Sequence, residues 1–235
     1  MRNHFWSIKL LVGYVLFSVL SLVLHSCDDT MELQDVTVNG AVYRTEKDSG
    51  IFLDITQFNS PLYRYHPMVN GIPAWNYNQT QRYIVDEFIL QAQYDSVYIM
   101  AVEIENTIIT DTVRMPGNFR IYTDTSDTIL AAYGDAPVIR WSQADSISRY
   151  FAEFFFYDNY GYKNILRQVK LGQDTTYSMP RFDAYGVFQL DVYAYQHSVY
   201  HPQRGQLTEF SKPVSWEVNG SWGAWVRRTI TFWVL

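Results

Sequence analysis

Short runs of alternating apolar and polar residues dominate the chain from Leu33 to Leu235. No long segment of this region repeats its apolar residues with the helical period of about 3.6, which argues against a bundle of amphipathic helices. Alternation with a period of two places one set of side chains on each face of a strand. Asp, Asn, Gly and Pro separate the runs, as turn residues do. The sequence therefore predicts an all-β fold built from many short strands.

Three runs carry this prediction most clearly. Ser96–Ile104 and Thr107–Met115 are separated by the two residues Glu-Asn, a spacing typical of a β-hairpin. The run "FQLDVYAY" begins at Phe188 and alternates apolar with mostly polar residues, so its odd and even positions should face opposite sides of a sheet. Thr229–Leu235 alternates up to the last residue, which predicts that the C-terminus is part of a sheet.

The first 26 residues have the three parts of an export signal. Arg2 and Lys9 lie in a short basic segment, an apolar stretch runs from Leu10 to Leu24, and small polar residues follow. The apolar stretch has 15 residues. As a helix it would be about 23 Å long, whereas the hydrocarbon core of a bilayer is about 30 Å thick. A cleaved signal peptide (1–26) is therefore predicted in preference to a membrane-spanning helix.

The stretch "LHSC", Leu24 to Cys27, resembles the tetrapeptide at which bacterial lipoproteins are cleaved and lipidated. The resemblance implies that Cys27, the one cysteine of the sequence, becomes the acylated N-terminus. Acyl chains contribute about 0.8 kcal/mol per buried methylene and can hold a protein to a membrane without a spanning segment. Asp28 and Asp29 resemble the signal that places Bacteroidota lipoproteins on the outer face of the outer membrane. The alternative is that these acids merely begin a solvated tether, 27–33.

The charge balance limits the possible partners. Without Arg2 and Lys9 the mature chain has 16 basic and 24 acidic side chains, a formal charge of −8. Nucleic acid is an unsuitable partner because its binding depends on clustered Lys and Arg. Lipidation of Cys27 leaves no cysteine for a disulfide, so stability must come from apolar burial, and about 209 residues suffice for one large or two modest cores.

The number of runs is consistent with two consecutive β-sandwiches, 34–120 and 121–235, with a boundary around 118–137. The second half resembles a fibronectin-type-III-like, immunoglobulin-like domain. The resemblance assigns "APVIRW" with Trp141 to the second strand, "RYFAEFFFYD" to the third, "NILRQVKL" to the fourth, "GVFQLDVYAYQ" to the sixth, and the stretch from Trp222 to the last. Phe188 stands where that family usually has a tyrosine, so the ring can fill the volume but cannot make the corner hydrogen bond.

The first half resembles the carboxypeptidase-regulatory-like or transthyretin-like sandwich of Bacteroidota lipoproteins. The segments behind this resemblance are "VTVNGAV", "YDSVYIMAVEI" and "TDTVRMPGNF". Together with "NGSWGAW" near the end, the order is similar to a group of such lipoproteins of unknown function. The resemblance implies a fold but no activity, because one fold hosts many functions.

The segment 59–83 is rich in aromatic and amide side chains and has Pro, Gly and Asn punctuation without sustained alternation, so it is predicted to be a long loop. Long loops on rigid sandwiches often carry binding groups. Aromatic rings can stack on sugar rings while amides bond hydroxyl groups. The candidate rings are those of Tyr63, Tyr65, Trp75 and Tyr77, with Asn76, Asn78, Gln79 and Gln81 as amides. The alternative is that these rings cap the open end of a sandwich.

Signs of catalysis or metal binding are weak. His197 and His201 lie four apart in a strand pattern, and their Cα atoms would be about 13 Å apart, too far to share one ion. Glu103 and Glu105 share one strand face at about 6.7 Å, a spacing that glycosidases use but that any solvated strand can produce. The sequence has no G-x-S-x-G, H-E-x-x-H or phosphate loop. A non-enzymatic protein without metal or cofactor is predicted.

Asp followed by Ser or Thr and then an apolar residue or Thr occurs six times. About one occurrence is expected by chance. The pattern is similar to the site at which Bacteroidota O-glycosylate exported proteins, but a turn Asp followed by a β-branched strand residue gives the same string. The candidate hydroxyl groups belong to Thr30, Ser96, Thr112, Thr128, Ser146 and Thr175.

The preferred hypothesis is a surface-tethered, non-enzymatic lipoprotein of the outer membrane that binds an extracellular ligand or an outer-membrane protein partner, with a role in glycan uptake. A second hypothesis is an adhesin or assembly subunit that pairs through edge strands, with Thr229–Leu235 as the suspected strand. A third is an exported hydrolase that uses Glu103 and Glu105. The sequence does not choose the ligand.

Overall fold

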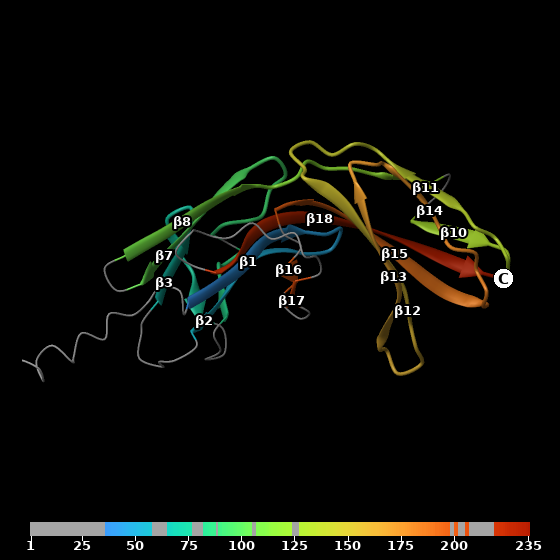
Figure 1. The fold of residues 1–235 in the computed structure, drawn as a ribbon, viewed down its shortest axis with the longest axis horizontal. Coiled ribbons are helices and arrows are strands. Elements are labelled where there is room, and N and C mark those ends of the chain that lie inside the picture. The colour runs from blue at the N-terminus through green and yellow to red at the C-terminus, as the bar shows by residue number, and fades with distance from the viewer. Residues whose placement is uncertain are drawn as a thin grey trace, which may run out of the picture. The chain divides into compact units, whose positions relative to one another are not determined.

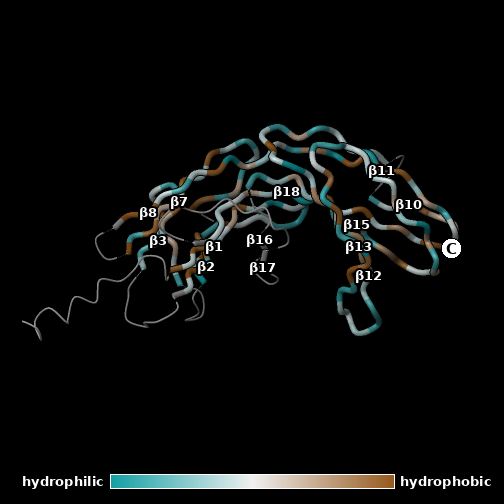
Figure 2. The backbone as a smooth tube through the Cα atoms, viewed as in Figure 1, coloured by the Kyte–Doolittle hydropathy of each residue, from teal (hydrophilic) through white to brown (hydrophobic). Residues whose placement is uncertain are grey.

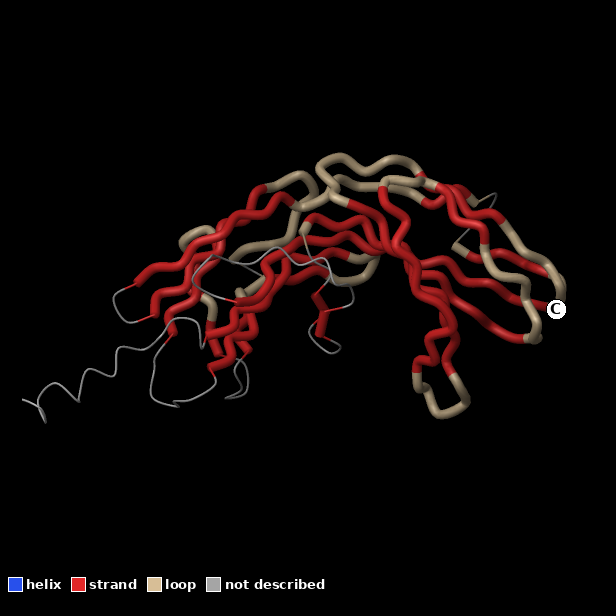
Figure 3. The backbone as a smooth tube through the Cα atoms, in the orientation of Figure 1, coloured by secondary structure: helices blue, strands red, loops and turns tan. Residues whose placement is uncertain are grey.

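The computed structural model describes residues 36–57, 65–76, 82–87, 89–104, 107–123, 127–197, 200–201, 205–206 and 219–235. These residues form strands and loops without a helix, so none of them lies in a helix long and apolar enough to cross a membrane (Figures 1 and 3). The predicted all-β fold is confirmed. The signal peptide, Cys27 and the tether lie outside the described residues.

Half of the described strands belong to one large sheet. In order across it lie β13 (Lys163–Gly172), β12 (Arg149–Tyr157), β15 (Gly186–Gln196), β18 (Asn219–Val234), β1 (Val36–Arg44), β2 (Ser49–Gln57), β6 (Arg82–Ile84) and β5 (Trp75–Asn76), with β10 (Thr128–Ala131) beside β18. A three-stranded sheet has the order β14 (Thr176–Ser178), β11 (Val138–Trp141), β9 (Ile121–Tyr122). A four-stranded sheet has the order β4 (Ile72–Pro73), β3 (Tyr65–Val69), β7 (Val97–Ile104), β8 (Thr107–Arg114), and β16 (Tyr200–His201) pairs with β17 (Gly205–Gln206). The predicted hairpin is β7–β8.

The C-terminal strand β18 joins segments from both ends of the chain. It pairs antiparallel with β15 over most of its 16 residues and parallel with β1 from Asn219 to Val226. Its last residues, Thr231–Val234, pair with β10 on the other side. The hypothesis that Thr229–Leu235 is a free edge strand is therefore wrong, because 231–234 has a hydrogen-bonded neighbour on each side. A domain boundary at 120 stays a prediction, and β18 lies in one sheet between β1 of the first half and β15 of the second half.

Close packing between β1 and β18 requires a glycine at position 220. Gly220 has a φ of +136°, a conformation that side chains rarely adopt, and a Cβ there would lie 1.8 Å from the Val38 carbonyl oxygen. The parallel pairing of the two strands therefore depends on the absence of a side chain at this position.

The second half folds as the predicted fibronectin-type-III-like sandwich. The sheet β14-β11-β9 packs on β13-β12-β15-β18, with Trp141 of β11 5.5 Å from Tyr150 of β12 between ring centroids. The predicted second, third, fourth, sixth and last strands correspond to β11, β12, β13, β15 and β18. Phe188 is buried and lies 5.6 Å from both Phe154 and Phe182, so its ring fills the corner volume as expected.

The large sheet is buried on both of its faces near its centre, and Figure 2 shows hydrophobic and hydrophilic residues along its strands. Leu190, Val192 and Ala194 of β15 share the face with Phe188 and are buried in the sandwich. Asp191, Tyr193 and Tyr195 lie on the opposite face and are also buried. This opposite face of the large sheet, called the second face below, carries the structure's main candidate sites.

Candidate functional site

The predicted aromatic loop contains four strands, β3 to β6, so the expectation of a long loop is wrong. Strands of two to five residues are too short to show a periodic pattern between Pro and Gly. Tyr65 lies half-buried in β3 of the four-stranded sheet, whereas Trp75 lies in β5 of the large sheet and is 49% exposed. The two rings therefore belong to different sheets. Tyr63 and Tyr77 lie outside the described residues, as do Asn78, Gln79 and Gln81.

Glu103, the described member of the predicted carboxylate pair, lies on β7 opposite His66 of β3. The His66 Nδ1 is 3.9 Å from Glu103 Oε2, and the two side chains are 65% and 45% exposed. Glu105 lies outside the described residues. Water screens the charge of a partly exposed carboxylate, so such a group stabilises a transition state only weakly, which counts against the hydrolase hypothesis.

Possible metal ligands do not gather in the described part of the chain. Within it, no group of three or more His, Cys, Asp or Glu residues is placed to hold an ion. His197 has a φ of 68° at the end of β15, and nothing is described of the His201 side chain.

The Asp-Ser/Thr sites differ in accessibility. Thr112 and Thr128 are exposed, whereas Ser96, Ser146 and Thr175 are half-buried. Thr30 lies outside the described residues. Their O-glycosylation stays a prediction, and accessibility favours the two exposed threonines.

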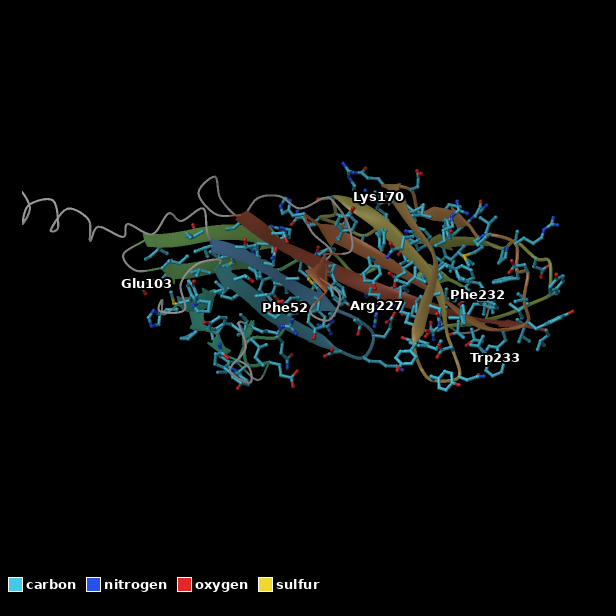
Figure 4. The ribbon with its side chains drawn as sticks, turned by 60° about the horizontal axis from the view of Figure 1, so that its bottom comes forward. Phe52, Glu103, Lys170, Arg227, Phe232 and Trp233 are labelled. Atoms are coloured by element: carbon cyan, nitrogen blue, oxygen red, sulfur yellow. The ribbon has the colours of Figure 1, made fainter. Side chains whose placement is uncertain are left out.

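A buried charge cluster at the centre of the second face was not predicted from the sequence. Glu153 of β12 and Asp191 of β15 are cross-strand partners and are 0% and 1% exposed. The Lys163 ammonium donates to the Glu153 carboxylate and lies 3.3 Å from Asp191 Oδ2, and it also lies 3.4 Å above the Phe155 ring. Arg227, labelled in Figure 4, is the second base of the cluster and lies 3.6 Å from Asp191 Oδ2. With two acids and two bases, the cluster is formally neutral.

Every carboxylate oxygen of the cluster has a protein partner. Thr229 donates to Asp191 Oδ1 at 2.7 Å, and Oδ2 faces the Tyr193 hydroxyl and the Arg227 guanidinium at 3.4 and 3.6 Å. On Glu153, Oε1 accepts from Lys163 and Oε2 from Gln168, the latter at 2.9 Å. Neither acid therefore has an oxygen turned to a substrate, and the cluster is a structural network rather than an acid-base pair.

The cluster also shifts the acidity of its neighbours. Burial, followed by the charge of Asp191, raises the pKa of Tyr193 well above its ordinary value. Burial by itself would lower the pKa of Arg227, but the charge of Asp191, with smaller contributions from a hydrogen bond with Tyr193 and the charge of Glu46, more than offsets it and the pKa is raised. Tyr193 therefore stays neutral and Arg227 stays charged at physiological pH.

Aromatic rings cover the second face beyond Arg227. Trp225 stacks on Tyr43 at 5.0 Å and meets the edge of Tyr193 at 5.5 Å. Ala41, Phe52, Phe151 and Tyr195 complete this buried cluster. Burial, followed by the charge of Asp48 and a hydrogen bond to its carboxylate, raises the pKa of Tyr43 to about 12.

The second face opens to solvent at the other end of β18. Phe232 points into the sandwich and is buried, whereas its neighbour Trp233 points outward and is 49% exposed (Figure 4). Val187 of β15 and Leu130 of β10 are the direct cross-strand partners of Trp233, and both are exposed. Tyr157 of β12 is also exposed, and its ring lies 5.5 Å from Phe155, which places it on the same face. Leu130, Trp233, Val187 and Tyr157 are called the Trp233 row below.

A polar row lies beside the Trp233 row. Gln189 of β15 and Thr128 of β10 are the cross-strand partners of Thr231 on β18, two residues from the apolar row in each strand. The Gln189 amide donates to the Thr231 hydroxyl at 3.5 Å. An exposed indole with aliphatic neighbours next to amide and hydroxyl groups can hold a ligand that has apolar faces and hydroxyl edges. These residues could not be predicted from the sequence, because alternation assigns Trp225 and Trp233 to one face without showing which of them is exposed.

Two hollows lie elsewhere on the described surface. One, of about 270 Å³, is lined by Glu46, Asn118, Arg120, Ile121, Thr123, Asp127, Arg228, Thr229 and Ile230. Its Arg228 lies 3.5 Å from Glu46 and donates to the Tyr94 hydroxyl and the Phe119 carbonyl, so this cation is already engaged. The other, of about 230 Å³, is lined by residues 44–49 and Glu87. Neither includes a residue of the Trp233 row.

Comparisons with known proteins add little on function. No protein-family model and no curated protein matches the chain. Among solved structures, the FN1–FN3 domains of chicken CNTN1 are similar, with a TM-score of 0.30 and 12% identity over 67% of this chain and 57% of that chain. A likeness at this level carries no argument about activity or partners. The assignment to a fibronectin-type-III-like β-sandwich therefore depends on the strand order described above.

Proposed function

We propose that this protein is a surface-tethered, non-enzymatic lipoprotein that binds a neutral extracellular glycan on the Trp233 row. The observation that supports the proposal most is the half-exposed Trp233 indole between exposed Val187 and Leu130, beside a row of amide and hydroxyl groups. Isolated exposed apolar residues are ordinary on a soluble domain, but a contiguous exposed apolar row is a feature of interaction sites.

The chemistry of the two rows favours a neutral sugar over a charged ligand. Leu130, Trp233 and Val187 offer apolar surface, and Gln189, Thr231 and Thr128 offer donors and acceptors without charge. The nearby cations are turned away, since Lys163 and Arg227 face the carboxylates of the buried charge cluster. With a net charge of −6, the chain would also repel polyanions.

The location is proposed from the sequence. Acylation at Cys27 would tether the sandwich to the outer membrane, and the acidic residues after it favour the outer leaflet, where an extracellular glycan is accessible. Labelled palmitate should be incorporated into the wild type and not into Cys27→Ser, and protease added to whole cells should cleave the wild type. Incorporation into Cys27→Ser, or complete protection from protease, would contradict this part of the proposal.

The binding test uses a matched pair of tryptophans. Trp233 and Trp75 are both 49% exposed and both lie on the large sheet, and the apolar and polar rows described above lie beside Trp233. Wild type, Trp233→Ala and Trp75→Ala should be titrated with a panel of neutral polysaccharides by isothermal calorimetry. We expect binding by the wild type and by Trp75→Ala, and a loss of about tenfold or more for Trp233→Ala. No binding by the wild type, or equal binding by Trp233→Ala, would refute the proposal. Loss in Trp75→Ala alone would favour the segment predicted from the sequence.

A further inference from the structure

We propose that the Trp233 row takes the interior of an extended polysaccharide chain that lies across the strands, with the β12–β13 hairpin extending the site at one end. This inference rests on the proposed function, since it names the form of the ligand and its direction on the same face.

The Trp233 row runs across the strands of the large sheet. Leu130, Trp233 and Val187 are successive cross-strand partners on β10, β18 and β15, so the row runs perpendicular to the strands. The β12–β15 register ends at Phe155 paired with Gln189, and two residues further along the same face lies Tyr157. Four adjacent strands therefore each contribute one exposed apolar residue. At the usual spacing of about 4.8 Å between strands, the row is about 14 Å long, which fits several linked sugar units better than one.

The Trp233 row is open to solvent, since Leu130, Trp233 and Val187 are 73%, 49% and 43% exposed. Recognition of a single sugar or a chain end requires walls that surround it, as in a concave ligand pocket. Both described hollows are lined entirely by residues outside the Trp233 row. A polymer can lie on an open row and continue past it at either end.

A hairpin loop, residues 158–162, joins β12 to β13 directly after Tyr157 of the row. Figure 3 shows this loop projecting on the side of the large sheet away from β11 and β14, which is the side of the second face. Tyr160 and Tyr162 at its tip are 87% and 71% exposed. A chain that leaves the row beyond Tyr157 would meet these rings next.

The tip is held in one conformation by Asp158. Its Oδ1 accepts the backbone N–H groups of Tyr160 and Tyr162, each at 2.9 Å, and its Oδ2 accepts the Asn164 amide at 3.3 Å. The hydrogen bond from the Tyr162 amide makes the largest contribution to lowering the pKa of Asp158, so the carboxylate stays ionised well into the acid range. Rings on a pre-ordered loop lose little conformational entropy on binding, which is why tyrosines on rigid loops are effective contacts.

The experiment is a chain-length series with a matched tyrosine control. Cello-, malto-, xylo- and manno-oligosaccharides from dimer to hexamer should be titrated into wild type, Trp233→Ala, the double variant Tyr160→Ala/Tyr162→Ala, and Tyr122→Ala. Tyr122 is an exposed tyrosine on β9 of the three-stranded sheet and has no part in the row. We expect wild-type affinity for one series to rise about tenfold or more from dimer to hexamer. The double variant should lose most of that rise, and Tyr122→Ala should keep it.

The outcomes separate this inference from the proposed function. Binding that depends on Trp233 but has equal affinity for every length would refute the inference and leave the function standing. A rise with length that the double variant keeps in full would remove the hairpin from the site. Failure of the wild type to bind any member or parent polymer would refute both. A concentration-dependent dimer that disappears in Trp233→Ala would also refute both, because a second copy of the chain would then cover the row.

Discussion

Removing one charge from the buried charge cluster should destabilise the sheet far more than removing an exposed one. Asp191 is 1% exposed and serves four groups: the Thr229 hydroxyl at 2.7 Å, the Lys163 ammonium at 3.3 Å, the Tyr193 hydroxyl at 3.4 Å and the Arg227 guanidinium at 3.6 Å. Asp191→Asn keeps the shape and one acceptor oxygen but leaves Lys163 and Arg227 with one carboxylate between them. Breaking a buried pair in this way costs about 3–5 kcal/mol of the free energy of unfolding.

Urea unfolding of the detergent-solubilised protein, followed by tryptophan fluorescence, measures this loss. Trp222 and Trp225 are buried on β18, and Trp225 lies 5.5 Å from Tyr193 beside the cluster, so their emission should report the transition. The double variant Asp191→Asn/Lys163→Gln restores neutrality, because it leaves Glu153 with Arg227. Its loss should be smaller than the sum of the two single losses by at least about 1 kcal/mol.

The control is the ion pair between Arg82 and Asp54 on β6 and β2. The Arg82 guanidinium donates to both Asp54 oxygens, at 2.7 and 3.0 Å, but the pair is partly exposed. Asp54→Asn should therefore cost about 1 kcal/mol or less. A loss below about 1 kcal/mol for Asp191→Asn, or strict additivity in the double variant, would refute the view that the cluster acts as one neutral unit.

Three further predictions follow from single contacts. The pKa of Tyr43 is about 12 in the folded chain and 10.0 in a free tyrosine, so folding favours the neutral form. The contribution of Tyr43 to the free energy of unfolding should be full below pH 10 and lost between pH 10 and 12. A urea midpoint that stays constant across this range would contradict the raised pKa. Gly220→Ala should unfold the protein or displace β1, with a loss of about 3 kcal/mol or more in the free energy of unfolding. The control is Gly134→Ala, which should cost about 1 kcal/mol because Gly134 has a φ of +89° but nothing within 4 Å of its Cβ. Equal thermal shifts for the two variants would refute the close approach of β1 to Gly220. If the Asp-Ser/Thr sites are glycosylated, intact-peptide mass spectrometry should find more sugar at exposed Thr112 than at half-buried Ser146, and the reverse order would contradict selection by accessibility.

The sequence pattern was sufficient for the strands of the second half. "GVFQLDVYAYQ" became β15, as its alternation predicts, and "RYFAEFFFYD" became β12, as a short and nearly continuous aromatic run predicts for a strand buried on both faces. The pattern could not show which strands pair. β1 and β18 are parallel neighbours, although about 180 residues separate them in the chain. Periodicity describes the faces of one strand and contains no information on its partner.

Burial on the second face was equally inaccessible to the pattern. Asp191 occupies the polar phase of β15, which usually faces water, yet it is buried because Lys163 and Arg227 neutralise it from neighbouring strands. The segment 59–83 was predicted to be a loop, although it contains four strands. Its strands are so short that Pro, Gly and Asn were taken as evidence of a loop, and the aromatic residues seemed to form one site when Tyr65 and Trp75 lie in different sheets.

One strand, β18, connects the interior of the protein with its proposed binding surface. Along its second face come Trp225 in the aromatic cluster, Arg227 and Thr229 in the charge cluster, Thr231 in the polar row and finally exposed Trp233. The charge cluster therefore lies on the second face between its buried part, around Trp225, and its exposed part, around Trp233. Because its hydrogen bonds cross β13, β12, β15 and β18, it fixes the register that aligns the exposed residues into a row. A binding row built on paired strands needs such support, since a slip of one residue would turn Trp233 into the sandwich and Phe232 into solvent.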